Sequence, residues 1–210
     1  MKRFQLATST LLCLLILFLS TNACHSDNRD SWQQPQKIMD TTGVRPGMVI
    51  GEAGAGEGYF TFKLARRVGK TGKIYANDIK ENVLRTIKKR CQKEGIKNIT
   101  TILGKVDDPL FPVGELDMVI MVCAFHDFEQ PVEWLNNVKP SLKPNATLVI
   151  VDRDPDKWGR GWNHFMTKEK VLKTVKQADY ELIRIETFLP RDNIYIFRPK
   201  QGSIKDFMTK

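Results

Sequence analysis

Three glycines stand at alternate positions in the segment Met48 to Gly58, directly after a short apolar run that ends in an acid. An amphipathic helical pattern then begins at once, with apolar residues at every fourth position. This order predicts a β-strand, a glycine-rich turn and a helix. Glycine lets a backbone approach a ligand closely, and a helix N-terminus presents free N–H groups and a positive dipole end. The segment therefore predicts a site for a nucleotide-like ligand. The turn carries Glu52, Gly54, Gly56 and Gly58, and the apolar helix positions are Phe60, Leu64 and Val68.

The spacing of these glycines distinguishes between nucleotide-binding families. Dinucleotide sites use G-x-G-x-x-G, whereas this chain has G-x-G-x-G with an acid, Glu52, two residues before the first glycine. The pattern resembles the first motif of class I S-adenosylmethionine (SAM) methyltransferases. The resemblance implies that Glu52, Gly54, Gly56 and Gly58 help to bind S-adenosyl-L-methionine. A nicotinamide oxidoreductase is disfavoured by the spacing, and the motif alone leaves open a glycine turn that binds nothing.

Three later segments fit the same plan. Lys73 to Asp78 is expected to be a strand ending in an acid, about 20 residues beyond the last glycine, where such folds bind ribose hydroxyls. The expected strand 98–103 precedes Asp107 and Asp108, and the resemblance implies that an acid there lies near the adenine amino group. The nearly all-apolar run 116–122 is typical of a buried parallel strand.

Strands that alternate with helices predict a mainly parallel sheet covered on both faces. The resemblance implies a doubly wound α/β, Rossmann-like methyltransferase fold with seven strands in the order 3-2-1-4-5-7-6, strand 7 being antiparallel. Ligands in such sheets bind beyond the carboxyl ends of the strands, where strand order switches, and Ala124 is expected there too. The expected strands are 48–51, 73–78, 98–103, 116–122, 147–151, 180–189 and 193–197. The expected helices are 32–42, 57–68, 80–93, one beginning at Pro131 and one capped by Thr167.

The segment after the fourth strand carries the candidate catalytic residues, His126 and Asp127. The resemblance implies that this segment faces both cofactor and acceptor. His126 is a candidate base because an imidazole titrates near neutrality, or it caps the next helix or bonds to backbone. Asp127 is either catalytic or an acid at a helix N-terminus. We expect no metal ion, but a metal-dependent catechol-type enzyme using Asp127, Asp152 and Asp154 stays an alternative.

A long loop after the fifth strand contains Trp158, Trp162 and His164. Long loops in compact domains often cover binding sites, so these side chains are expected to bind the substrate; alternatively, the tryptophans cover sheet edges. The N/D-P-P-Y/F sequence of enzymes that methylate amino groups of nucleic acids is replaced by Ala124 to Asp127. The chain carries a net charge of +9, but its basic residues are not interleaved with aromatic ones. We therefore expect no nucleic-acid partner.

The first residues predict export. Lys2 and Arg3 precede an apolar run, 11–19, that is short for a bilayer span but typical of a signal peptide. The end of the run resembles a bacterial lipoprotein signal, which implies cleavage after Ala23, lipidation of Cys24 and anchoring to a membrane of the cell envelope. Cleavage to a soluble periplasmic protein and a retained apolar anchor are the alternatives. The expected units are a signal peptide (1–23), a polar tether (24–31), one methyltransferase domain (32–200) and a tail (201–210).

These observations give two hypotheses for function. The first is a SAM-dependent methyltransferase that acts on an unidentified small molecule. The second is an exported ligand-binding protein with a methyltransferase fold and no catalysis, because SAM is made in the cytosol whereas the signal directs the domain outward. Cys91 and Cys123 are the only cysteines after Cys24, which predicts no disulfide framework. The sequence predicts neither the acceptor nor the oligomeric state.

Overall fold

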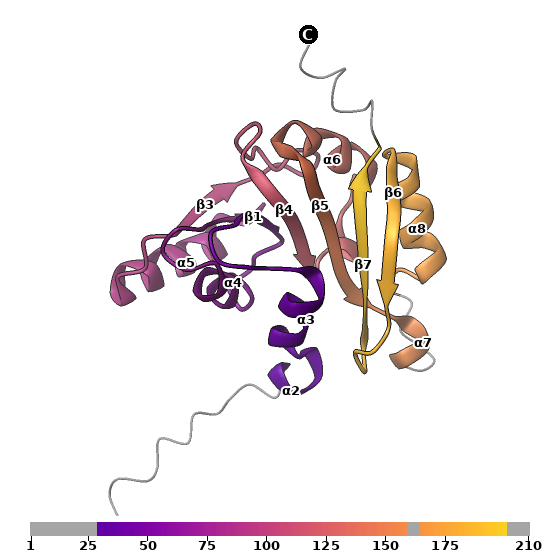
Figure 1. Cartoon of the computed structure of the whole chain (residues 1–210), viewed down its shortest axis with the longest axis horizontal. Coiled ribbons are helices and arrows are strands. Elements are labelled where there is room, and N and C mark those ends of the chain that lie inside the picture. The colour runs from indigo at the N-terminus through magenta and orange to yellow at the C-terminus, as the bar shows by residue number, and fades with distance from the viewer. Residues whose placement is uncertain (1–28, 159–163, 201–210) are drawn as a thin grey trace, which may run out of the picture.

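The computed structural model describes residues 29–158 and 164–200 (Figure 1). The predicted signal peptide, Cys24, most of the predicted tether, Trp162 and the tail lie outside these residues, so they stay predictions. Within the described part of the chain, no helix combines the length and apolar character needed to cross a bilayer.

A seven-stranded sheet forms the centre of the molecule, in the order β3-β2-β1-β4-β5-β7-β6. The first five strands pair in parallel, and β7 is antiparallel to both β5 and β6. This confirms the predicted α/β fold and strand order. The strands are β1 (Val49–Ala53), β2 (Lys73–Asp78), β3 (Ile99–Leu103), β4 (Leu116–Val122), β5 (Leu142–Arg153), β6 (Tyr180–Glu186) and β7 (Asp192–Pro199).

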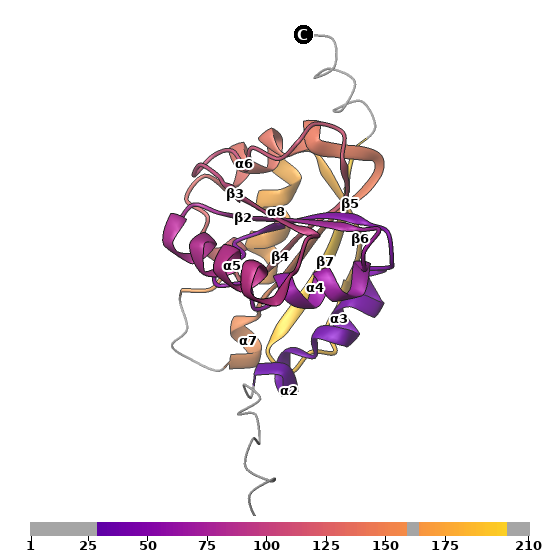
Figure 2. The same cartoon turned by 90° about the vertical axis from the view of Figure 1, so that its left-hand side faces the viewer.

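Apolar side chains on alternate strand positions build one core on each face of the sheet. Buried residues of α3 (Pro35–Thr42) and α4 (Thr61–Val68) pack with Ile50, Ile120 and Val149 on one face. Buried residues of α6 (Pro131–Asn137) and α8 (Lys168–Gln177) pack with Met121 and Ile150 on the other face. Figure 2 shows α4 and α5 below the strands and α6 above them. The helices are α2 (Arg29–Gln33), α3 (Pro35–Thr42), α4 (Thr61–Val68), α5 (Glu81–Glu94), α6 (Pro131–Asn137), α7 (Pro155–Trp158) and α8 (Lys168–Gln177), with 3₁₀ turns η1 (Phe125–Asp127) and η2 (Lys139–Ser141).

Several element ends differ from the sequence-based expectation. The expected leading helix is split, because Pro35 lacks an N–H and restricts Gln34, which adopts a left-handed conformation with φ 50°. Helix α4 begins at Thr61 rather than at Glu57, since the glycine turn uses the intervening residues. Strand β1 continues to Ala53 and therefore includes Glu52.

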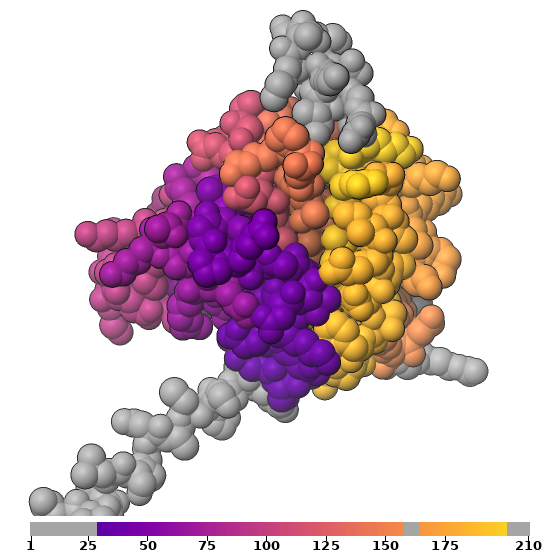
Figure 3. All heavy atoms as spheres, viewed as in Figure 1, coloured from indigo at the N-terminus to yellow at the C-terminus, as the bar shows by residue number. Residues whose placement is uncertain are grey.

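The first helices lie against the last two strands of the sheet. The Gln33 amide donates to the Asp192 carboxylate over 3.2 Å, and the Arg184 guanidinium donates to the Thr41 carbonyl over 2.6 Å. Figure 3 shows the indigo N-terminal segment in direct contact with the yellow strands. The described chain thus begins near the carboxyl ends of the parallel strands. The last strand, β7, is antiparallel to β5 and runs toward the amino ends of the parallel strands.

Candidate functional site

A pocket of about 430 Å³ opens at the carboxyl ends of β1, β2 and β4. This is the point where strand order switches, because β1 has β2 on one side and β4 on the other. The volume suits a small organic ligand. The lining residues are Gly54, Asn77, Asp78, Ile79, Lys80, Lys105, Val106, Cys123, Ala124, Asp127, Phe128, Glu129 and Trp134. Gly54, Asp78, Ala124 and Asp127 are therefore brought together as expected.

The glycines of the turn after β1 serve different structural purposes. Gly54 has φ 71°, and a Cβ on it would lie 2.4 Å from the Ala124 Cβ, so glycine allows the β1 and β4 ends to approach. A Cβ on Gly58 (φ 91°) would lie 2.6 Å from the Phe62 ring. Gly56 has φ 53° and open space beside it. A side chain at Gly54 or Gly58 would thus clash with a neighbour. At Gly56 the only reason for glycine is the left-handed backbone conformation.

Asp78 ties the glycine turn to the end of β2. Its Oδ2 accepts the Gly56 N–H over 2.9 Å, and its Oδ1 accepts the Lys80 N–H over 3.0 Å. The carboxylate also lines the pocket. A carboxylate has about four acceptor positions, so two backbone bonds leave capacity for ligand hydroxyl groups.

Glu52 is buried on the face of the sheet that packs against α3 and α4. Its Oε2 has no hydrogen-bond partner among the described residues. Burial raises the pKa of Glu52 to about 8, although the nearby Thr61 hydroxyl and the Arg29 charge act in the opposite direction. Glu52 lies outside the lining of the pocket, so a contact with ligand stays a prediction.

The loop after β3 contributes Lys105 and Val106 to the pocket. Asp107 and Asp108 follow as part of a local turn, in which the Asp108 carboxylate accepts the Leu110 N–H over 2.9 Å. The Asp107 carbonyl accepts the Asn137 amide over 2.9 Å. Their predicted role at the adenine group is untested.

Most of the lining residues were not predicted as site residues, among them Asn77, Ile79 and Trp134. Asn77 is buried and donates to the Pro109 carbonyl over 2.9 Å, which fixes the loop after β3. Ile79 is an exposed apolar side chain directly after Asp78. Trp134 was expected only as part of a helix. Ile79 is an apolar residue in the turn between β2 and α5, where polar residues are usual. This contrast is the signal that could have identified it.

His126 is held by a carboxylate from the neighbouring strand. It lies in η1, and its Nδ1 is 2.6 Å from the Asp152 Oδ1 while its backbone N–H donates to the Asp152 Oδ2 over 2.9 Å. The side chains are only 7% and 2% exposed. Burial acts to lower the pKa of His126, but the hydrogen bond and charge of Asp152, with Asp127, outweigh burial and raise it above its ordinary value of 6.5. An Nδ1–H that donates to the Asp152 carboxylate leaves Nε2 of the neutral ring as the acceptor.

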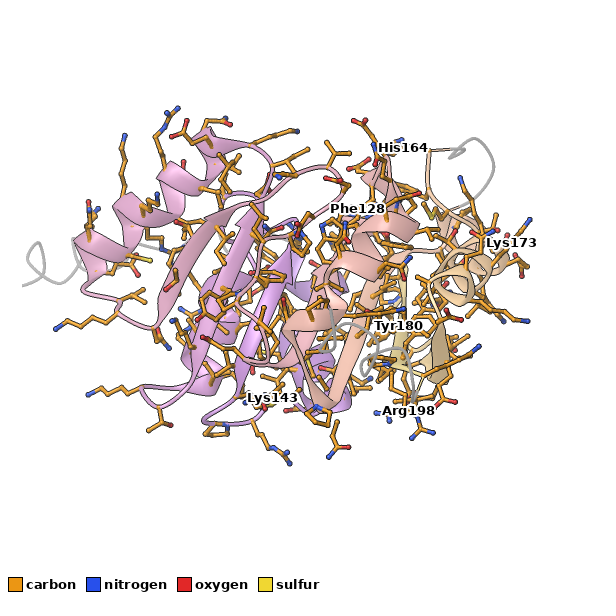
Figure 4. All side chains as sticks on the ribbon, turned by 90° about the horizontal axis from the view of Figure 1, so that it is seen from above. Phe128, Lys143, His164, Lys173, Tyr180 and Arg198 are labelled. Atoms are coloured by element: carbon orange, nitrogen blue, oxygen red, sulfur yellow. The ribbon has the colours of Figure 1, made fainter. Side chains whose placement is uncertain are left out.

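Asp127 and His164 lie beside the free nitrogen of His126. The His126 Nε2 is 3.6 Å from one Asp127 oxygen, and the His164 Nε2 is 2.9 Å from the other. The Phe165 ring packs edge-on against His126 with a centroid separation of 4.9 Å. Figure 4 shows His164 and Phe128 at the same edge of the molecule, opposite the edge that carries Lys143.

The loop after β5 is only partly described. Trp158 ends the short helix α7, and Trp162 lies outside the described residues, so the predicted substrate contacts of both tryptophans are untested. Asp154 accepts the Asn193 amide over 2.8 Å and so has a structural partner. In the predicted alternative metal site of Asp127, Asp152 and Asp154, the Asp154 carboxylate is therefore hydrogen-bonded to Asn193 instead.

Comparison with known proteins gives consistent results. A family model described as a methyltransferase domain matches residues 45–186. The chain is 32% identical over 112 residues to the 2-phytyl-1,4-naphtoquinone methyltransferase of Trichormus variabilis, covering 53% of this chain and 49% of that protein. It is 28% identical over 115 residues to the ubiquinone/menaquinone biosynthesis C-methyltransferase UbiE of Hydrogenovibrio crunogenus, covering 54% and 45%. The chain thus spans about half the length of these curated relatives.

A solved structure shares the fold over most of the chain. The SAM-dependent methyltransferase from Aquifex aeolicus superimposes with a TM-score of 0.76 at 24% identity, covering 81% of this chain and 92% of that one. At this level of identity the likeness concerns the fold.

Proposed function

The chain belongs to the methyltransferase domain family, and from this premise we propose that it transfers the methyl group of SAM to a small molecule. The observation that carries the proposal is the pocket at the switch point, where Gly54, Asp78 and Ala124 meet. The acid at the end of β2 is the group expected to bind ribose hydroxyls. Ile79 offers an apolar surface beside that acid, which suits a planar base.

The proposed reaction is a direct substitution at the methyl carbon. The acceptor atom forms a bond to this carbon as the bond from carbon to sulfur breaks, and the sulfonium becomes a neutral thioether. The acceptor loses its proton, which the free Nε2 of His126 can receive while Asp152 stabilises the resulting imidazolium. The remaining contribution of the protein is to align acceptor and methyl group.

The acceptor class that we favour is a small aromatic ring with a hydroxyl group. Phe128 and Trp134 line the pocket, and Phe165 packs against His126. Aromatic side chains suit an apolar ring, and a weakly acidic hydroxyl suits a histidine base. The names of two relatives refer to quinone biosynthesis and a naphthoquinone, which supports this class.

We also propose that the protein acts at the membrane surface through a lipid on Cys24. Five peptide links join Cys24 to Arg29, so the two residues lie within about 18 Å of each other. Arg29 begins α2, and Gln33 at the end of this helix donates to the Sγ of Cys123, which lines the pocket. An anchor at Cys24 would therefore keep the pocket close to lipid-soluble acceptors.

The test is a transfer assay with the full chain, SAM labelled in its methyl group and a panel of hydroquinones. We expect labelled product, and we expect His126→Ala to lower kcat by about 10²- to 10⁴-fold if it removes a base. Asp152→Asn should lower kcat less, because it changes the orientation of the base rather than removing it. Asp40→Ala serves as the control, since Asp40 pairs with Arg67 on the surface.

Each failure has its own meaning. Equal rates in wild type and His126→Ala would overturn the assignment of the base. SAM binding without transfer to any acceptor would favour the non-catalytic binding protein.

A further inference from the structure

The geometry points to a binding site for a divalent transition-metal ion, such as Zn²⁺, formed by His126, Asp127 and His164. One ligand atom from each side chain can be chosen so that all three lie within 4.8 Å of one another. Zinc bonds to nitrogen and oxygen of about 2.0–2.2 Å place the ligands of a tetrahedral site about 3.4 Å apart. The His126 Nε2 lies 3.6 Å from one Asp127 oxygen and the His164 Nε2 lies 2.9 Å from the other, so each imidazole is near this separation from a different oxygen of the same carboxylate.

The donor set is chemically selective. Two imidazoles and one carboxylate are characteristic of transition-metal sites that keep positions open for water or substrate, whereas Mg²⁺ and Ca²⁺ prefer oxygen ligands. The chain contains three histidines in all. Two of them, from η1 and from the segment before α8, meet at this cluster. Both of these imidazoles therefore belong to one candidate site.

A buried carboxylate already positions the first ligand. Asp152 binds the Nδ1 of His126 and its backbone N–H, so the ring is fixed and Nε2 points toward Asp127. Metal-binding histidines commonly donate their second ring N–H to a carboxylate in this way, which fixes the tautomer. The Phe165 ring packs against both imidazoles, with centroids 4.9 Å and 5.5 Å away.

The other two ligands are accessible to an incoming ion. The Asp127 and His164 side chains are 60% and 65% exposed, and Asp127 also lines the pocket. A bound ion would therefore face the acceptor side of the pocket. Coordination uses the same Nε2 lone pair as the proposed proton transfer, so the two are alternative uses of His126. The inference goes beyond the proposed function and does not depend on SAM.

The experiment is a calorimetric titration of Zn²⁺ into the full chain without an affinity tag, after treatment with a chelator. We expect one ion per chain with micromolar or tighter affinity. His164→Ala and Asp127→Ala each remove a ligand. Loss of an outer carboxylate, as in Asp152→Asn, typically costs about 10- to 100-fold in affinity, and the two ligand variants should lose at least as much.

His25→Ala is the matched control, because it removes the third histidine, which lies outside the described residues. Its affinity for Zn²⁺ should equal that of the wild type. Co²⁺ should give the intense visible absorption of a low-coordinate site in the wild type and in His25→Ala, but not in His164→Ala. Melting curves without metal would verify that each variant folds.

Absence of Zn²⁺ binding by the wild type, or equal binding by His164→Ala and the wild type, would overturn the metal site. A SAM titration of the same proteins separates this outcome from a failure of the proposed function. Wild type and His164→Ala should bind SAM equally, because none of the residues assigned to SAM is changed.

Discussion

At the scale of single residues, Glu52 is held in an unfavourable environment for a charge. It is buried at the end of β1, and one carboxyl oxygen has no hydrogen-bond partner among the described residues. Burial raises the pKa of this group from 4.5 to about 8. The folded protein therefore holds a proton at Glu52 over a pH range in which the unfolded chain has released it.

This difference predicts how stability depends on pH. Because the folded pKa lies above the unfolded pKa, the contribution of Glu52 is most favourable below about pH 4.5 and is lost as pH rises toward 8. The free energy of unfolding should fall by up to about 1.4 kcal/mol per pH unit in this window. Glu52→Gln should remove this dependence and make the protein more stable than wild type above pH 8.

Denaturant unfolding at pH 5 and pH 8.5 measures the effect, with Glu57→Gln as the control, since Glu57 is an exposed glutamate in the same turn. If Glu52→Gln and wild type show the same change in stability between these pH values, the proposed environment of Glu52 is wrong.

Sequence reasoning proposed Asp78 and His126 as site residues but did not predict the way each is held. Asp78 follows a strand at the spacing expected for a ribose-binding acid, so a local pattern sufficed. The contact between His126 and Asp152 joins residues 26 positions apart and depends on the adjacency of β4 and β5. His126 follows β4 and Asp152 lies near the carboxyl end of the neighbouring strand β5, and this is the signal that could have paired them.

At the scale of elements, the turn between β1 and α4 positions the pocket. We expect Gly54→Ala to destabilise the fold by about 2–4 kcal/mol, because a left-handed backbone and overpacking against Ala124 both add cost. Gly56→Ala should cost only about 1–2 kcal/mol, since it has open space beside it. Chemical denaturation measures both values.

The second substitution Ala124→Gly isolates the steric part of this cost. In the Gly54→Ala background it removes the Cβ that lies in the way, so part of the lost stability should return. No recovery in the double variant would show that contact with Ala124 is not the reason for glycine at this position.

The positions of strands were predicted more reliably than the ends of elements: each expected strand overlaps an observed one, although β5 begins at Leu142 rather than at 147. The apolar run 116–122 coincides with the buried strand β4. A strand that is buried on both faces of a sheet is apolar at nearly every position, so it can be recognised from the sequence. The start of α4 was wrong by four residues, since the turn conformation depends on the contacts of Gly54 and Gly58 with distant side chains. The sheet order followed from the family resemblance, because strand adjacency is not encoded in local patterns.

At the scale of the whole molecule, the proposed lipid anchor on Cys24 would hold the pocket near a membrane. We expect Cys24→Ser to move the protein from the membrane to the soluble fraction, because a lipid anchor contributes about 0.8 kcal/mol per buried CH₂. Intact mass of the membrane form measures the lipid directly. An unmodified Cys24, or a chain that still begins at Met1, would contradict lipidation.

SAM binding is the central claim of this account, and calorimetric titration of the full chain with SAM tests it most directly. We predict one SAM per chain, with Asp78→Ala weakening binding by roughly 1.5–3 kcal/mol, the usual contribution of a hydrogen bond to a charged group. Asp78→Asn should lose less, because its carbonyl oxygen still accepts one hydrogen bond, and Asp40→Ala should bind like wild type. Absence of SAM binding by the wild type, or equal binding by Asp78→Ala, would contradict the proposed cofactor site.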